Sequence, residues 1–139
     1  MNDTTGKRKL LRTIDFAKRE TIESIVDTNN PKIQWLSYAI KLSETEIVVK
    51  LSNVRLCCEM YGIYCSETRR DDVIGATVSR VNLYERVGEN GCEPERSVIL
   101  EIVTDRGPFD LYLYCAHNGY YPHDYSITLS GEPVINGTL

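Results

Sequence analysis

The spacing of the apolar residues changes once along the chain, at Pro31, and this change most constrains what the chain can fold into. Between Leu10 and Val26 the apolar residues recur every three to four positions, which is typical of an amphipathic helix. After Pro31 they alternate with polar residues and many are β-branched, which is typical of strands. Because a proline cannot comfortably continue a helix, the sequence predicts a helix over residues 10–26 and a β-rich part over residues 32–131.

The β-rich part contains about six segments with strand-like alternation, joined by short links. They lie at residues 33–42, 47–56, 76–87, 97–104, 109–115 and 125–129. Turn-forming residues separate them, among them the Thr-Asp-Arg-Gly-Pro-Phe segment at 104–109. The Cys-Cys-Glu-Met-Tyr-Gly segment at 57–62 is interpreted as a tight turn or a single helical turn. Residues 69–75 are interpreted as a second short turn, capped by Asp71 or Asp72.

The expected fold class is therefore α+β, an antiparallel sheet of about six strands with the N-terminal amphipathic helix packed on one face. The length of 139 residues predicts a single domain over residues 9–139, and the polar residues 1–8 are expected to form a disordered tail. Such a sheet has an uncovered edge, and exposed tyrosines are enriched in subunit contacts. We therefore expect a homo-oligomer.

The composition argues against several classes of function. A net charge of -4 disfavours binding to extended nucleic acid, which requires a basic face. No segment approaches the ~18 consecutive apolar residues of a membrane span, and the N-terminus lacks the apolar core of a signal peptide, so no membrane association is expected. The five cysteines are an odd number in a chain without a secretion signal, which indicates reduced thiols in an intracellular setting.

Cysteine and histidine side chains are numerous enough for a metal site, but their spacing argues against one. Structural zinc sites use two pairs of closely spaced ligands, and the chain lacks that pattern. Whether Cys58, Cys115 and His117 come together in three dimensions as metal ligands stays open. The chain also lacks a nucleophile elbow, a glycine-rich phosphate loop and a paired-carboxylate signature. We therefore expect a protein that is not an enzyme and that carries no cofactor and no metal.

The segment from Leu113 to Tyr125 combines both histidines with several tyrosines around an Asn-Gly turn. The predicted ligand site combines this turn with a second polar turn and comprises His117, Asn118, Tyr120, Tyr121, His123, Arg69 and Arg70. One of two adjacent tyrosines on a strand faces outward, where it can stack on a planar ring, and the arginines can bind a phosphate. Two alternatives stay open: the exposed tyrosine is an interface residue, and the arginines pair with neighbouring acidic residues on a solvated turn.

Three short blocks occur in order along the chain. They are Cys-Cys-Glu-Met-Tyr-Gly at 57–62, Asp-Asp-Val-Ile-Gly-Ala-Thr-Val-Ser-Arg-Val at 71–81 and His-Asn-Gly-Tyr-Tyr at 117–121. This ordered set resembles a family of small uncharacterised proteins found mainly in tailed phages and large DNA viruses, and the resemblance covers residues 33–131. The chain departs from the family at 121–123, where it has Tyr-Pro-His and the family pattern more often resembles Tyr-Tyr-Gly-Gly.

The resemblance implies a context and no catalytic residues. The context is a viral accessory protein or a virion component, located in the cytoplasm of the infected host cell or in the virion. The function expected in this context is the binding or sequestration of a small nucleotide-like ligand, which would counter a host defence. The alternative is a structural or interaction protein, such as a minor virion component, whose partners are copies of itself or other virion proteins.

Overall fold

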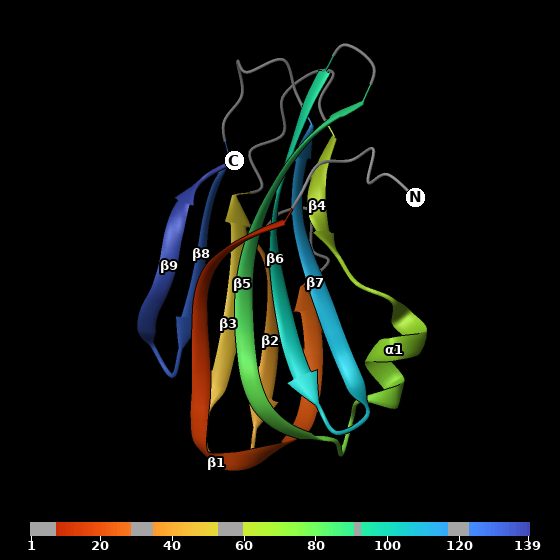
Figure 1. Cartoon of the computed structure of the whole chain (residues 1–139), viewed down its shortest axis with the longest axis vertical. Helices are drawn as coiled ribbons and strands as arrows, with labels where there is room; N and C mark the ends of the chain where they lie inside the picture. Colours follow the sequence, from red (N-terminus) through yellow and green to blue (C-terminus); the bar gives the residue numbers. More distant parts are fainter. Residues whose placement is uncertain (1–7, 29–34, 53–59, 91–92, 117–122) are drawn as a thin grey trace.

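The computed structural model describes residues 8–28, 35–52, 60–90, 93–116 and 123–139, and within these ranges it consists of antiparallel strands and one short helix (Figure 1). The strands are β1 (Arg8–Thr28), β2 (Trp35–Leu42), β3 (Glu46–Ser52), β4 (Met60–Tyr64), β5 (Thr77–Asn90), β6 (Glu93–Thr104), β7 (Gly107–Ala116), β8 (Asp124–Leu129) and β9 (Glu132–Thr138), and the helix is α1 (Glu67–Asp72). Their spatial order is β4-β7-β6-β5-β1-β2-β3-β8-β9.

The long strand β1 divides the nine strands into two packed layers. Its first half pairs with β5 and its second half with β2, and the register shifts between Asp15 and Glu20, where the strand bends (Figure 1). Strands β4, β7, β6 and β5 with the first half of β1 form one layer, called sheet A. The second half of β1 with β2, β3, β8 and β9 forms the other, called sheet B. Apolar side chains of both sheets share one core, so the fold is a β-sandwich in which β1 belongs to both sheets.

The predicted helix over residues 10–26 is wrong, and with it the α+β fold class, because this segment is strand β1. Two irregularities in the pairing with β5, between Leu10 and Arg12 and between Asp15 and Glu20, interrupt the two-residue alternation. Core-facing residues are therefore separated by three or four positions in places, which imitates the spacing of a helix. The β-branched residues of the segment favour a strand, and both halves of β1 gain neighbours in a sheet.

The six predicted strands are present as β2, β3, β5, β6, β7 and β8, with ends that differ by a few residues. Strands β4 and β9 were not predicted. The turn expected at 69–75 overlaps α1, whose cap is Ser66 rather than Asp71 or Asp72, because the Ser66 hydroxyl accepts a hydrogen bond from the Arg69 backbone N–H (3.3 Å). Within the described ranges, no helix is long and apolar enough to cross a membrane.

A buried carboxylate holds the bend of β1. Glu20 is only 9% exposed and accepts hydrogen bonds from the Glu44 backbone N–H (2.7 Å) and from the Thr45 hydroxyl (2.6 Å), both in the turn between β2 and β3. The Thr21 backbone N–H adds a further link to this turn through the Ser43 hydroxyl (3.2 Å). The corner where β1 passes from sheet A to sheet B is therefore tied to the β2–β3 turn by charge-assisted hydrogen bonds.

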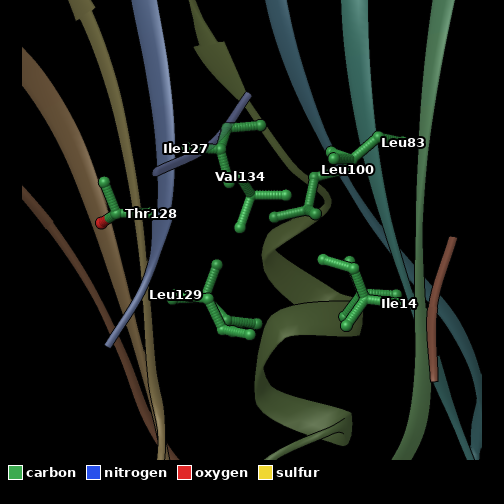
Figure 2. A pocket seen from close by; sticks show the side chains of 9 residues that line it. Ile14, Leu83, Leu100, Ile127, Thr128, Leu129 and Val134 are labelled. Atoms are coloured by element: carbon green, nitrogen blue, oxygen red, sulfur yellow. The ribbon is translucent and has the colours of Figure 1, made fainter. Parts of the chain in front are cut away.

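A small apolar hollow lies between the two sheets (Figure 2). Its walls include Ile14, Leu83 and Leu100 of sheet A and Ile127, Leu129 and Val134 of sheet B. The volume is about 10 Å³, which is about the room that one water molecule needs. Small-molecule sites are far larger, so this hollow does not hold a nucleotide-sized ligand. A ligand or partner of that size would therefore bind at the surface and not in this hollow.

Candidate binding face

Four residues of the predicted ligand site lie outside the described residues, in the segment between β7 and β8. They are His117, Asn118, Tyr120 and Tyr121. The other three predicted residues are described, and the structure does not bring them together in one site. His123 lies just before β8, whereas Arg69 and Arg70 belong to α1.

The side chain of His123 is buried, with 1% of its surface exposed, and it is therefore not an imidazole at the rim of a surface site. Its Nδ1 lies 2.7 Å from the Ser52 carbonyl oxygen, and since a carbonyl only accepts, Nδ1 carries a proton and donates it. The ring stacks on Tyr61, with 4.2 Å between ring centroids. The backbone of His123 exchanges hydrogen bonds with Leu139 (3.1 and 2.8 Å). These contacts join the start of β8 to sheet A and to the C-terminal residue.

Arg69 binds backbone carbonyls of the turn between β6 and β7. Its Nη2 donates to the carbonyl oxygens of Arg106 (2.9 Å) and Pro108 (3.1 Å). Arg106, in the β6–β7 turn, in return binds the end of α1, because its Nη1 donates to the carbonyl oxygens of Asp72 (2.8 Å) and Ile74 (2.9 Å). The two guanidinium groups therefore fasten α1 to the β6–β7 turn, and the Nη2 donors of Arg69 already bind the chain itself.

We expect Arg69→Ala to destabilise the fold by about 1 kcal/mol, because it removes two hydrogen bonds that water can partly replace at this exposed turn. Urea unfolding measures the change. Arg70→Ala is the matched control, since Arg70 makes only a partly exposed ion pair and its loss should cost a few tenths of a kcal/mol. If Arg69→Ala is as stable as the wild type but does not bind a nucleotide that the wild type binds, Arg69 is a ligand-binding residue and not a structural one.

Arg70 pairs with Asp27 near the end of β1, at 4.0 Å. Arg69 lies at the end of the sandwich where β7 begins, because it contacts Pro108 at the start of that strand. The segment 117–122 follows the last residue of β7, and ten residues of antiparallel strand span roughly 30 Å. The two polar turns of the predicted site therefore attach to opposite ends of β7.

Cys115 is buried on the core side of β7. Cys58 and His117, the other two residues of the metal site that was left open, lie outside the described ranges. Among the residues that the structure describes, no three His, Cys, Asp or Glu side chains are placed to hold a metal ion.

Cys65 donates a hydrogen bond to the Tyr38 hydroxyl (3.7 Å). Burial, followed by this contact, raises the pKa of Tyr38 above its usual value, so Tyr38 is a protonated residue of the core.

A row of aliphatic and aromatic side chains crosses the outer face of sheet A. Directly opposed residues of an antiparallel sheet point to the same face, so the register of the five strands aligns side chains in rows. The middle row consists of Leu10, Tyr84, Ile99, Tyr112 and Tyr64, one residue from each strand. The two ends of this row are exposed, Leu10 by 53% and Tyr64 by 51%. The middle row and the two rows beside it are called the tyrosine face.

Arg8 covers the centre of the tyrosine face. Its guanidinium carbon lies 5.7 Å from the centroid of the Tyr84 ring and 6.0 Å from that of Tyr112. The same guanidinium donates to the Tyr112 hydroxyl (3.1 Å) and pairs with Asp110 (3.5 Å). Ile99 stands opposite both tyrosines in the sheet and is fully buried, although it faces away from the core between the sheets. Arg8 and the two tyrosines therefore form a small second apolar cluster around Ile99.

The two rows beside the middle row carry opposite charge. The basic row consists of Arg8, Arg86, Ser97, Tyr114 and Gly62, and the acidic row consists of Thr13, Asn82, Glu101 and Asp110. Hydrogen bonds run along the acidic row, from the Thr13 hydroxyl to Asn82 (2.8 Å) and from the Asn82 amide to Glu101 (2.9 Å). The tyrosine face is thus apolar along its middle, basic on one side and acidic on the other.

The tyrosine face is not part of the predicted ligand site, although part of its signal is visible in the sequence. The Leu-Tyr-Leu-Tyr segment at 111–114 places both leucines in the core, and alternation then directs Tyr112 and Tyr114 outward together. A pair of outward tyrosines on one strand indicates a surface more strongly than adjacent tyrosines, which a strand directs to opposite faces. The alignment of these tyrosines with residues of β1, β4 and β5 depends on strand pairing, which the sequence does not display.

Comparison of the chain with protein-family models, with curated proteins and with solved structures found no match. The resemblance to the viral family therefore stays a prediction, and so do the viral context and the location that it implies.

Proposed function

We propose that this protein is a non-enzymatic interaction protein that associates with further copies of itself through the tyrosine face. The observation that supports the proposal is the middle row, in which one leucine and three tyrosines accompany a buried isoleucine on the outer face of a sheet. The outer face of an antiparallel sheet that contacts only water is usually polar. Tyrosine and arginine are enriched in protein interfaces, where they supply large contact areas.

Binding of a small nucleotide-like ligand has less support. Its expected aromatic residues at 117–121 lie outside the described ranges, and Arg69, one of the two arginines expected beside them, is attached to the opposite end of β7. Nucleotide binding therefore stays a prediction, to be decided by calorimetry of the wild type against a panel of cyclic and linear nucleotides. Self-association through a sheet face suits the alternative of a structural protein, such as a minor virion component.

The proposal predicts that a Leu10→Ser, Tyr64→Ser double variant associates at least tenfold more weakly than the wild type. Both side chains are about half exposed at the ends of the middle row, so their replacement removes apolar contact area while leaving the core intact. Light scattering coupled to size-exclusion chromatography, over a range of protein concentrations, measures the association of both proteins.

Val26→Ser provides the matched control. Val26 is 58% exposed, as exposed as the two replaced residues, but it lies in the second half of β1 and pairs with β2 in sheet B. It should leave the association unchanged. A wild type that has a mass of 15.8 kDa at every concentration, or a control that weakens association as much as the double variant, would contradict the proposed function.

A further inference from the structure

The ring of Tyr64, at the β4 end of the middle row, lies over a glycine of its own strand. A Cβ atom at Gly62 would lie 2.9 Å from Cζ of Tyr64, 3.0 Å from its hydroxyl oxygen and 3.1 Å from its Cε2. Non-bonded carbon atoms pack at about 3.5–4.0 Å, so these distances are too short for a methyl group. The Tyr64 ring therefore occupies the space that a side chain at position 62 would need.

The backbone of Gly62 does not itself require a glycine. Its φ is not among the positive φ values of the chain, and its place within β4 is extended backbone that any residue adopts. In a strand interior, glycine is less favourable than alanine because it loses more conformational freedom on folding. The missing side chain at position 62 therefore has its structural consequence in the placement of the Tyr64 ring.

Two further contacts hold the Tyr64 ring. It meets the Tyr114 ring edge to face, with 6.0 Å between centroids and 71° between ring planes, and its hydroxyl donates to the Tyr61 carbonyl oxygen (3.4 Å). Tyr114 stands directly opposite Gly62 in the pairing of β4 with β7, so a ring that lies over Gly62 also contacts Tyr114. Tyr64 is nevertheless 51% exposed. Its ring is thus held in place while half of its surface stays open to a partner.

Sheet B contains a similar arrangement with the opposite burial. A Cβ atom at Gly137 would lie 3.1 Å from Cε1 of Tyr125, which stands directly opposite this glycine in the pairing of β8 with β9. Tyr125 is only 8% exposed and belongs to the core between the sheets. A glycine beneath a tyrosine thus supports the core in sheet B, whereas in sheet A the same arrangement presents an exposed ring.

We propose that Gly62 is a positioning residue of the tyrosine face, which keeps the Tyr64 ring in the conformation that binds a second copy. This inference rests on the proposed function and identifies what orders one end of the middle row. Fixing a mobile side chain during association weakens binding, and a ring that is already held in the free protein avoids most of that loss. A side chain at position 62 displaces the ring, so that association has to order it again.

Gly62→Ala in the full-length chain tests the inference. The ring is the far end of a flexible side chain and swings away from the new methyl group, so association should weaken roughly threefold to tenfold. Light scattering coupled to size-exclusion chromatography over a range of protein concentrations measures this change. The variant should unfold at about the same urea concentration as the wild type, because the preference of a strand for alanine offsets the lost ring contacts. A purely structural role of Gly62 would instead lower the urea midpoint.

A double-mutant cycle shows whether Gly62 acts through Tyr64. Tyr64→Ser alone should weaken association by a factor similar to that of Gly62→Ala. Adding Gly62→Ala to Tyr64→Ser should then change the association by less than about twofold, because no ring is left to displace.

Gly137→Ala is the matched control, since it places a methyl group under the buried Tyr125 in sheet B. The Tyr125 ring has no free space into which it can move, so this variant should unfold at a lower urea concentration than the wild type. Its association, measured without urea, should equal that of the wild type.

The ring position can also be measured without association. In dilute, monomeric protein, the Hα resonances of Gly62 should be shifted by the Tyr64 ring current, and this shift should be absent in Tyr64→Ser. Equal Gly62 resonances in the two proteins would overturn the inference.

The outcomes separate this inference from the proposed function. If Gly62→Ala associates as strongly as the wild type, or weakens association just as much in the Tyr64→Ser background, Gly62 does not act by positioning Tyr64. The proposed function then still stands if the Leu10→Ser, Tyr64→Ser variant associates more weakly than the wild type. A wild type that is monomeric at every concentration refutes the proposed function, and the positioning role with it, even where the Gly62 resonances show the ring in place.

Discussion

Replacement of Ile99 by alanine should destabilise the protein by about 2–4 kcal/mol, the range for a fully buried isoleucine that loses three carbon atoms. Ile99 belongs to the outer face of sheet A, where strand alternation predicts an exposed side chain, yet none of its surface is exposed. Tyr84 and Tyr112 stand on its two sides and the Arg8 guanidinium lies over both rings. The residue therefore contributes to stability as a core residue does, although it lies outside the main core.

Urea unfolding measures this effect, at protein concentrations low enough to keep association from adding to the stability. Leu10→Ala is the control, because Leu10 belongs to the same row but is 53% exposed, and its replacement should change the free energy of unfolding by less than about 0.5 kcal/mol. Ile99→Val should lie between the two, at about 1 kcal/mol. Equal effects of Ile99→Ala and Leu10→Ala would show that the Arg8 cover over Ile99 is not present in solution.

A second large effect is expected at the bend of β1, where Glu20→Ala should cost about 3 kcal/mol. The Glu20 carboxylate accepts hydrogen bonds from the Glu44 backbone N–H and from the Thr45 hydroxyl. Hydrogen bonds to a charged group contribute roughly 1.5–3 kcal/mol each, and the alanine variant leaves both donors without this acceptor. The change also loosens the passage of β1 from sheet A to sheet B, on which the two-layered arrangement depends.

Glu23→Ala is the matched control for Glu20→Ala, since Glu23 is an exposed glutamate of the same strand that pairs with Lys41 at 3.8 Å. Exposed ion pairs contribute little, so this variant should stay within about 0.5 kcal/mol of the wild type. Glu20→Gln should show an intermediate loss, because an amide retains one oxygen acceptor and loses the charge. If Glu20→Ala and Glu23→Ala unfold at the same urea concentration, the buried carboxylate does not stabilise the bend.

Local patterns in the sequence were sufficient to locate most strands, because alternation depends only on neighbouring residues. The segments now seen as β2, β3, β5, β6, β7 and β8 were predicted for this reason. The same reasoning failed for residues 10–26, where register shifts in the pairing with β5 break the alternation and leave a spacing like that of a helix. It also failed for β4 and β9, which are short, contain glycine and gain their stability from pairing with β7 and β8.

The candidate ligand site was predicted from residue types that are readable in the sequence, but its assembly requires Arg69 and Arg70 to lie near residues 117–121. That proximity depends on the path of the chain and not on residue type. The structure binds Arg69 near the start of β7, and residues 117–121 lie outside the described ranges, so the site stays a prediction.

The sequence by itself determined which side chains of a strand share a face, because successive residues of an extended chain point in opposite directions. For β7 it was enough to direct Leu111 and Leu113 inward and Tyr112 and Tyr114 outward. Only the tertiary structure decided which faces adjoin. The tyrosine face exists because β1, β5, β6, β7 and β4 pair in one register, which sets Leu10 opposite Tyr84 although they are far apart in the chain. Such pairings depend on the packing of the whole sandwich, and no local pattern encodes them.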